Sequence, residues 1–284
     1  MVNSNIMSSK KTNIVFFDLP SNLPNRQSVS PWCWRVRLAL NYKGLSYRTE
    51  WIDYPDISST CESLHIPPTN KNPDGTPRWD LPALIDETDP ESPVRIADAQ
   101  NIVLYLEEKY HDPSRSLFPS PFTTDGPAPC LYLLLKQFSD SYFVPYLAPL
   151  IIEETLKIMT PRSIVFKNAQ LRATTGAESL AAISAGKEGS PEKEAVWAKL
   201  EEGFGVLARL LESGEQLRWK LEGNDVEKGE FFMGNRLTYA DIYMCGTLIM
   251  IRTASPTGWE RVRKWHCGRW QRLWNAMEEY IKVV

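Results

Sequence analysis

Hydrophobic and polar positions follow a strand, helix, strand pattern near the start of the chain. Residues 14–17 are all apolar, as in a buried strand, and residues 47–52 alternate in polarity like a second strand. Between them, apolar side chains recur at helical spacing over residues 31–43, and Gly44 follows as a plausible helix stop. This helix leaves enough chain for a crossover between parallel strands, so the pattern predicts a βαβ unit.

Two further strands and a second helix are predicted downstream. Residues 81–85 form the third strand, with Pro82 near its head, where a missing N–H does no damage to the ladder. Residues 94–96 form a short fourth strand. Asp98 then precedes a helix-spaced apolar set that begins at Ile102, and an acidic residue favours a helix start. The first part of the chain is therefore expected to be an α/β domain.

The chain of 284 residues exceeds the usual size of a single core, so two domains are expected. A proline-rich passage at residues 113–129 is the natural boundary. Beyond it, residues 131–143 and 196–211 carry helical periodicity and alternation is scarce. The predicted domains are residues 12–111, of α/β class, and residues 126–284, which are all-helical.

Charge argues against a nucleic-acid partner. The formal net charge is −3, from 32 basic and 35 acidic residues, and no block of like charge stands out. Basic residues near the C-terminus alternate with tryptophans at helical spacing, so we expect the tryptophans to pack inward and the charges to face water. The tryptophans are Trp259, Trp265, Trp270 and Trp274, and the basic residues are Arg261, Arg263, Lys264, Arg269 and Arg272.

Compartment and metal content are also constrained. No apolar run reaches the roughly 20 residues that span a bilayer, and the polar residues 1–11 lack the apolar core of a signal peptide, so we expect a cytoplasmic protein without a membrane partner. Five cysteines form neither an even framework nor a metal-type cluster, and the three histidines lie at no zinc spacing, so no metal is expected. The cysteines are Cys33, Cys61, Cys130, Cys245 and Cys267.

The most informative position is Ser30, which stands directly before Pro31 at the start of the first helix. A helix N-terminus has unpaired N–H groups and a partial positive charge, both of which favour an anion. Serine before a helical proline is also an ordinary N-cap. The residue is therefore either a cap alone or a cap whose hydroxyl also serves a bound anion.

Several segments together resemble the glutathione transferase family. Residues 30–44 are similar to the first helix of the fungal Fu-type transferases and the related bacterial β-etherases. Leu81-Pro82 resembles the family's cis-proline turn, residues 102–110 its third helix, and residues 234–242 the capping segment of its second domain. The resemblance implies a thioredoxin-like N-terminal domain followed by an all-helical C-terminal domain.

The resemblance also implies a chemistry. Glutathione would be the co-substrate, with its thiolate stabilised by Ser30 as the catalytic residue, and with Leu81 and Pro82 among the residues that bind it. The electrophile would be a hydrophobic small molecule bound between the domains, and ether cleavage is one reaction it implies. Three aromatic residues are candidates for the electrophile site: Trp32, Tyr142 and Phe143. A homodimer and a role in detoxification complete the expectation.

One pair of residues departs from the family pattern. At the start of the third helix the family has an acidic or amide residue followed by serine, which hold the glutamyl end of glutathione. This chain has Asp98-Ala99 instead. Asp98 retains the carboxylate for the ammonium group, and helix N–H groups remain for the carboxylate of the ligand. The serine hydroxyl is missing, which weakens, alters or abolishes glutathione binding.

Two alternatives follow from the same residues. Ser30 and Cys33 occupy the ends of a C-x-x-C-like motif, so a glutathione-dependent thiol reductase using Cys33 is one alternative. A hydroxyl cannot form the mixed disulfide, and Cys33 is also explained as a small buried residue. Ala99 favours the other alternative, a non-catalytic ligand-binding or partner-binding protein with a transferase fold.

Overall fold

The chain folds into two compact units. The computed structural model describes residues 10–118, 128–222 and 229–284. The first unit runs to Ser116 and includes Tyr280–Val284, and the second is Leu117–Glu279. The division falls inside the proline-rich passage, of which Pro119, Pro121 and Pro127 lie outside the described residues.

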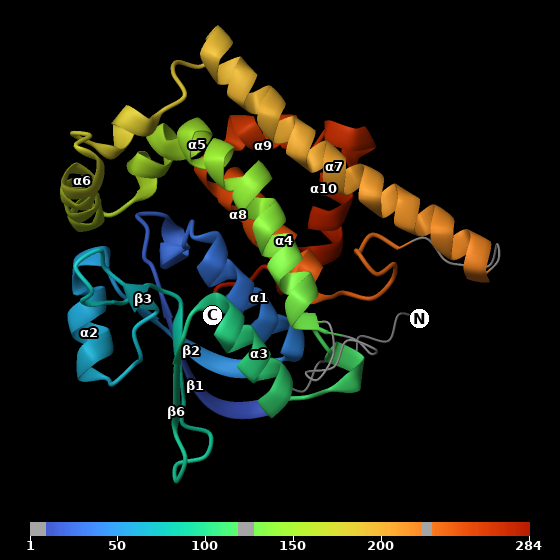
Figure 1. Ribbon diagram of the computed structural model, residues 1–284. Helices are drawn as coiled ribbons and strands as arrows, with labels where there is room; N and C mark the ends of the chain where they lie inside the picture. Colours follow the sequence, from blue (N-terminus) through green and yellow to red (C-terminus); the bar gives the residue numbers. More distant parts are fainter. Residues whose placement is uncertain (1–9, 119–127, 223–228) are drawn as a thin grey trace. The chain divides into compact units, whose positions relative to one another are not determined.

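A four-stranded sheet with the order β2-β1-β5-β6 forms the centre of the first unit (Figure 1). Its strands are β1 (Lys10–Asp18), β2 (Leu45–Trp51), β5 (Ala83–Asp86) and β6 (Val94–Ala97). β1 pairs parallel with β2 and antiparallel with β5, and β5 pairs antiparallel with β6. All four predicted strands are confirmed. The third predicted strand is β5, which begins at Ala83, so Pro82 lies just before it.

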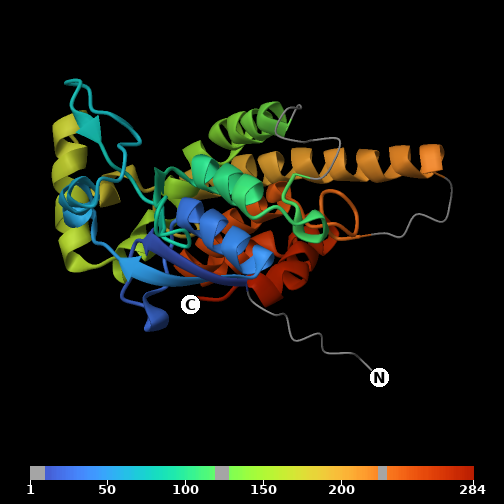
Figure 2. The ribbon, with the colours of Figure 1, turned by 90° about the horizontal axis from the view of Figure 1, so that it is seen from below.

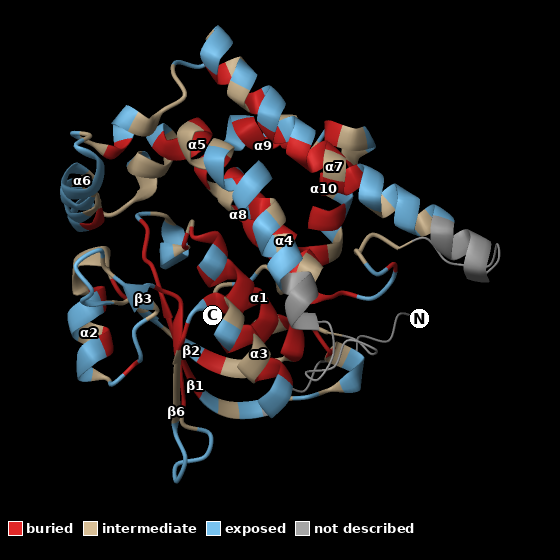
Figure 3. Ribbon diagram, viewed as in Figure 1, coloured by how far each residue is buried: buried red, intermediate tan, exposed pale blue. Residues whose placement is uncertain are grey.

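Two helices, α1 (Pro31–Lys43) and α3 (Ala99–Lys109), pack side by side in the first unit (Figures 1 and 2). Nearly every residue of α1 is buried, which Figure 3 shows as a red ribbon. The helix ends at Gly44, whose φ of 66° is left-handed and whose N–H donates to the carbonyls of Leu40 and Asn41. Glycine adopts this conformation without a Cβ penalty, so the predicted helix stop is confirmed.

Several short elements were not predicted. A 3₁₀ turn, η2 (Tyr54–Asp56), leads into α2 (Ile57–Ser63), and a small hairpin follows, made of β3 (Asn70–Lys71) and β4 (Pro77–Arg78). Helix α2 has only seven residues, of which Ile57 and Cys61 are buried. A helix of two turns cannot display a sustained 3.6-residue period, so the sequence pattern alone does not reveal it.

A buried ion pair lies between α1 and the sheet. Arg37 Nη2 donates to Asp18 Oδ2 at 2.9 Å, and each side chain is only 1% exposed. The guanidinium also donates to the Tyr47 hydroxyl at 3.3 Å and to the Thr49 hydroxyl at 3.2 Å, and it lies over the Phe16 ring. Since an isolated charge is costly in a core, this network is what permits Arg37 to lie inside.

The second unit is helical in its described residues, apart from two isolated β-bridges. Its helices are α4 (Ala128–Tyr142), α5 (Val144–Ile158), α6 (Pro161–Thr175), α7 (Pro191–Glu222), α8 (Tyr239–Ala254), α9 (Pro256–Val262) and α10 (Trp265–Met277). Both segments predicted to be helical are confirmed as parts of α4 and α7. Left-handed residues interrupt α10 near its start, at His266, Cys267 and Gly268.

The tryptophan-rich end of the chain is packed largely as predicted. All four tryptophans, Trp259, Trp265, Trp270 and Trp274, are buried. Lys264 and Arg272 are exposed and Arg261 and Arg263 are half-buried. Arg269 is the exception, because its side chain is buried and donates to Glu230 Oε2 at 3.2 Å. This ion pair offsets the cost of burying the guanidinium. Helical spacing alone could not indicate the pair, because Glu230 is distant in the sequence.

A capping box begins α8. The Asp241 carboxylate accepts from the Thr238 N–H at 2.8 Å, from the Thr238 hydroxyl at 2.9 Å and from the Phe232 N–H at 2.7 Å. Burial raises the pKa of Asp241 to about 6, although these three donors act in the opposite direction. The carboxylate thus satisfies the helix start and the preceding loop together.

The architecture matches the predicted fold class. The first unit has the mixed sheet and helices of a thioredoxin-like domain, and the second is a helical domain. Within residues 10–118, 128–222 and 229–284, no helix is both long and apolar enough to cross a membrane. Cys33, Cys61, Cys245 and Cys267 are free thiols, and the side chain of Cys130 lies outside the described part of the chain.

Candidate functional site

Ser30 is the N-cap of α1. Its backbone is extended, with φ −70° and ψ 117°, and its hydroxyl oxygen accepts the N–H of Cys33 at 3.4 Å. Pro31 occupies the first helical position, where no N–H is needed. The capping role predicted for Ser30 is therefore confirmed. The residue is 8% exposed, so its surroundings exclude most solvent while leaving some of its surface accessible.

The loop before α1 is held by a second serine. The N–H of Ser30 donates to the hydroxyl of Ser28 at 3.1 Å, and the carbonyl of Ser28 accepts from the indole N–H of Trp34 at 2.7 Å. Ser28 and Trp34 are both almost fully buried. Because the indole is packed in the core, this contact fixes the position from which the Ser30 hydroxyl projects.

Cys33 lies one turn into the helix and is fully buried. Burial raises the pKa of the Cys33 thiol well above its ordinary value, and the charge of Asp18 raises it further. The thiol therefore stays protonated at neutral pH, which makes it a poor nucleophile. The prediction of a small buried residue is confirmed.

The turn before β5 brings two predicted binding segments together. The Leu81–Pro82 peptide bond is cis, as the family resemblance implied. The carbonyl of Pro82 accepts the N–H of Asp98 at 3.2 Å, which joins this turn to the start of α3. Among the described residues, neither the N–H nor the carbonyl of Leu81 has a hydrogen-bond partner. Both groups are thus available to pair with an extended ligand backbone.

Asp98 is the N-cap of α3 and has an unusual backbone. Its φ of 78° lies in the region that favours glycine, and a non-glycine residue held there costs on the order of 1–3 kcal/mol. Its Oδ1 accepts from Gln100 N at 2.9 Å and from Asn101 N at 3.2 Å. The side chain is exposed, whereas Ala99 is only 3% exposed. Strain of this kind is typical of functional positions.

The first peptide of α3 is also available. The N–H of Ala99 has no hydrogen-bond partner within the described part of the chain. It stands at a helix N-terminus, beside the exposed carboxylate of Asp98. The start of α3 therefore offers a carboxylate for an ammonium group and an N–H for a carboxylate, which are the two charged groups of an α-amino acid.

Tyr54 is a residue of this region that the sequence pattern did not indicate. Burial raises the pKa of its phenol, and the negative charges of Asp80 and Asp18 raise it further. Tyr54 lies in η2, which has no period by which it could have been predicted.

The three candidate aromatic residues differ in exposure. In the first unit, Trp32 is 49% exposed and lies beneath the guanidinium of Arg35, 5.8 Å from the ring centroid. In the second unit, Tyr142 is 37% exposed and stacks on Phe138, with centroids 4.7 Å apart. Phe143 is fully buried among aromatic rings, including Phe138. Trp32 and Tyr142 thus have surface for a ligand, whereas the surroundings of Phe143 are those of a core residue.

Metal ligands are not grouped in the described residues. No set of three or more His, Cys, Asp or Glu side chains there is arranged to hold a metal ion. His266 accepts a hydrogen bond from the indole of Trp270 at 3.1 Å, and burial lowers its pKa.

Family models match both units. Residues 29–109 match the glutathione S-transferase N-terminal domain, and residues 131–280 match the glutathione S-transferase C-terminal domain. The second match alone covers more than half of the chain. The N-terminal match includes Ser30, the Leu81–Pro82 turn and the start of α3. The C-terminal match includes Tyr142 and Phe143.

Individual relatives agree with the family models. The glutathione S-transferase-like protein ustS of Aspergillus flavus is 27% identical over 275 residues, covering 94% of this chain and 90% of that protein. A glutathione S-transferase of Ceriporiopsis subvermispora, solved in complex with glutathione, has 29% identity and a TM-score of 0.79, covering 95% of this chain and 98% of that one. Glutathione transferase GSTFuA3 of Phanerochaete chrysosporium has 31% identity and a TM-score of 0.76, covering 96% and 98%.

Proposed function

Because the chain belongs to the glutathione S-transferase family, we propose that it is a glutathione transferase in which Ser30 activates the thiol of glutathione. The observation that carries the proposal is the Ser30 hydroxyl itself. It lies at the N-terminus of α1, and Ser30 retains some exposure. The N–H of Ser30 donates to the Ser28 hydroxyl, and the indole of Trp34 in turn holds the Ser28 carbonyl. A thiolate placed there gains a donor and the positive end of the helix dipole.

Glutathione binding is proposed along the edge formed by Leu81 and the start of α3. The N–H and carbonyl of Leu81 would pair with the cysteinyl backbone of the peptide. The carboxylate of Asp98 would meet the γ-glutamyl ammonium group, and the N–H of Ala99 would meet its carboxylate. The solved relative from Ceriporiopsis subvermispora that contains glutathione supports this choice of ligand.

The proposed reaction is attack of the glutathione thiolate on an electrophilic carbon of a hydrophobic molecule. A carbon–sulfur bond forms while the bond from that carbon to the leaving group breaks, and the leaving group departs with the electron pair. In ether cleavage the leaving group is an alkoxide or aryl oxide that takes a proton from water. Ser30 contributes by donating a hydrogen bond from its hydroxyl to the thiolate, because this stabilises the charged form and lowers the pKa of the thiol.

The electrophile is proposed to contact Trp32, the exposed aromatic candidate of the first unit, and Tyr142 of the second unit stays a prediction from the sequence. Aromatic side chains supply a large apolar area to such a ligand at low cost in conformational entropy. Phe143 remains part of the sequence-based prediction. The homodimer and the role in detoxification that the resemblance implies stay predictions, as does the cytoplasmic location expected from the sequence.

Calorimetric titration with glutathione tests the proposal directly, together with turnover of a generic aryl halide and of a β-aryl ether. We expect saturable binding and conversion of at least one electrophile. Saturable binding without turnover of any electrophile would favour the non-catalytic ligand-binding protein. Absence of binding at millimolar glutathione would contradict the glutathione site itself.

Cys33→Ala distinguishes the transferase from a thiol reductase. We expect transferase turnover within about 3-fold of the unchanged protein, because the buried, protonated Cys33 thiol is not a nucleophile. The measurement compares transferase turnover with glutathione-dependent reduction of a small disulfide. A reductase activity that the substitution abolishes would overturn the assignment of Ser30 as the active residue.

Ala99→Ser tests the departure from the family pattern. The new hydroxyl would donate to the glutamyl carboxylate, and hydrogen bonds to charged groups contribute about 1.5–3 kcal/mol when well formed. Position 99 is only 3% exposed, so desolvation of the new hydroxyl offsets part of this contribution, and we expect glutathione to bind roughly 3- to 10-fold more tightly, as measured by calorimetry.

The control ligand for this variant is cysteinylglycine, which lacks the glutamyl residue. Its affinity should not change, because the new hydroxyl would have nothing to hold. Equal gains for both ligands would indicate a general effect on the start of α3. A gain for neither would show that position 99 does not face the ligand.

A further inference from the structure

The helix that Ser30 caps holds the Ser30 hydroxyl only weakly. The hydroxyl oxygen accepts the Cys33 N–H at 3.4 Å, whereas N–H···O hydrogen bonds in proteins are usually about 2.9–3.0 Å long. Ser30 stands before the first helical residue and has an extended backbone, so the helical conformation does not fix its own dihedral angles. The position of the hydroxyl therefore depends on the groups that hold the backbone of Ser30.

Trp34 holds that backbone from two sides. Its own N–H donates to the Ser30 carbonyl at 3.1 Å. Its indole Nε1–H donates to the Ser28 carbonyl at 2.7 Å, and the Ser28 hydroxyl in turn accepts the Ser30 N–H at 3.1 Å. The carbonyl of Ser30 is thus held directly by Trp34, and the N–H of Ser30 is held through Ser28.

The indole of Trp34 is itself firmly packed. Trp34 is 1% exposed and Ser28 is 2% exposed, so water cannot take the place of the hydrogen bond between them. The guanidinium of Arg37 lies 5.8 Å from the centroid of the Trp34 ring, and Arg37 is paired with Asp18 of β1. A functional group must be held to within about 0.5 Å, and a side chain fixed by core packing can provide such support.

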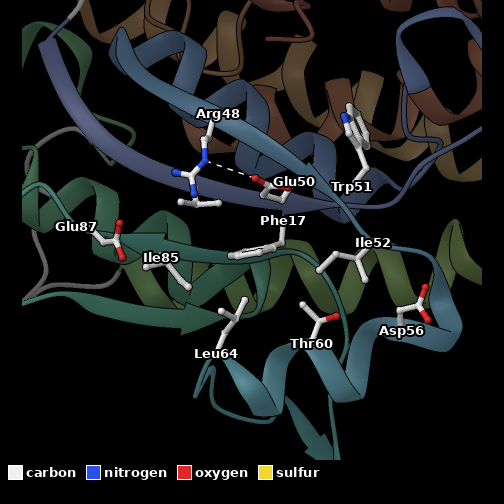
Figure 4. Close-up of a pocket in the computed structure, with 11 residues that line it drawn as sticks. Phe17, Arg48, Glu50, Trp51, Ile52, Asp56, Thr60, Leu64, Ile85 and Glu87 are labelled. Carbon is white, nitrogen blue, oxygen red and sulfur yellow. Dashed lines mark ion pairs between the residues drawn. The ribbon is translucent and has the colours of Figure 1, made fainter.

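This network lies on one face of the sheet. Phe16 of β1 faces α1, where its ring contacts the Arg37 guanidinium. The next residue, Phe17, faces the other side, where it lines a cavity of about 550 Å³ beneath α2 (Figure 4). Leu64 of α2 projects toward Phe17 from the opposite wall of this cavity. A change at Leu64 therefore alters packing in the first unit without touching the network around Trp34.

We propose that Trp34 is a positioning residue for the Ser30 hydroxyl and acts through the hydrogen bond from its indole to Ser28. This inference rests on the proposed role of Ser30 in activating glutathione. Trp34 is buried, so it affects the thiolate only by determining where the hydroxyl lies. Misplacement of the hydroxyl lengthens the hydrogen bond that stabilises the charged thiol. The indole N–H, and not the ring, is thus the group that matters.

Trp34→Phe in the full chain tests the proposal, because it removes the indole N–H and retains an aromatic ring. We expect kcat/KM for the electrophile to fall roughly 3- to 30-fold, and the rising limb of its pH profile to move to higher pH by less than in Ser30→Ala. Ser28→Ala removes the acceptor of the Ser30 N–H and should have the same effect. A merely structural role would lower the unfolding temperature without moving the pH profile.

Two control variants separate positioning from loss of stability. Trp270→Phe removes another buried indole N–H, which donates to His266 Nδ1 at 3.1 Å in the second unit. Leu64→Ala removes packing from the wall of the cavity beneath α2. Both variants should lower the unfolding temperature and leave the pH profile of kcat/KM unchanged.

The double variant Trp34→Phe with Ser30→Ala decides whether Trp34 acts through the hydroxyl. We expect it to be no slower than Ser30→Ala alone, because the group that Trp34 positions is already absent. Losses that multiply would overturn the proposal. An unshifted pH profile in a folded Trp34→Phe or Ser28→Ala variant, beside a shifted profile in Ser30→Ala, would overturn it as well. An unshifted profile in Ser30→Ala would refute the proposed function, and this inference with it.

Discussion

Replacing Ser30 with alanine is expected to lower turnover with a generic electrophile by roughly 10- to 1,000-fold, the range for loss of one strong donor in an active site. The pKa of the bound glutathione thiol should rise, because the hydroxyl no longer stabilises its charged form. In the pH profile of kcat/KM for the electrophile, the rising limb should therefore move to higher pH. Much of the lost rate should return in alkaline solution, where the thiolate forms without help.

The capping role of Ser30 requires a control. Loss of an N-cap serine or threonine costs about 0.5–2 kcal/mol of stability, so the variant is destabilised in any case. Thr160→Ala removes the N-cap of α6, where the Thr160 hydroxyl accepts the Ser163 N–H at 3.3 Å, and should leave the pH profile unchanged. An unshifted profile in a folded Ser30→Ala variant would mean that a backbone donor, and not this hydroxyl, stabilises the thiolate.

Replacing Arg37 with methionine is expected to lower the free energy of unfolding of the first unit by about 3–5 kcal/mol, because it leaves the Asp18 carboxylate buried without its partner. Methionine retains much of the apolar stem, so packing changes little. Two compact units can unfold separately, so the stability of the first unit must be measured by itself. Hydrogen exchange of the amides in β1 and α1, recorded at increasing urea concentration, gives the free energy of unfolding of this unit.

Two further variants define the origin of that effect. Adding Asp18→Asn to Arg37→Met should recover a large part of the loss, because no uncompensated charge then remains in the core. Arg48→Met breaks an ion pair whose side chains are 58% and 52% exposed, and should cost no more than about 1 kcal/mol. An equal cost for Arg37→Met and Arg48→Met would show that burial does not govern the Arg37 pair.

Local sequence signals determined much of the fold. The apolar run of β1, the helical spacing of α1 and the left-handed Gly44 each depend on residues close together in the chain. The capping box formed by Thr238 and Asp241 likewise involves only four consecutive residues. These elements could be predicted because side-chain periodicity and capping chemistry act over a few residues.

The candidate site was predicted in part. Ser30 was located by its place before Pro31, and the cis bond at Pro82 and the start of α3 by resemblance to a family. Tyr54 was missed because it lies in η2, an irregular turn of three residues that is too short to show a periodicity. The positive φ of Asp98 was also not predictable from its residue type, because most aspartates at helix starts have φ below zero.

The amino-acid sequence by itself determined the four strands and two long helices of the first unit, the division into an α/β and a helical part, and Ser30 as the cap of α1. Only the tertiary structure decided that Arg37 and Arg269 lie inside, since a charged residue at a helical position is expected to face water until a distant carboxylate is seen to pair with it. It also decided that a cavity remains beneath α2, because the space left between a sheet and a helix depends on side chains from four separate segments. Packing depends on residues that are far apart in the chain, whereas the patterns in a single sequence reflect only interactions between near neighbours.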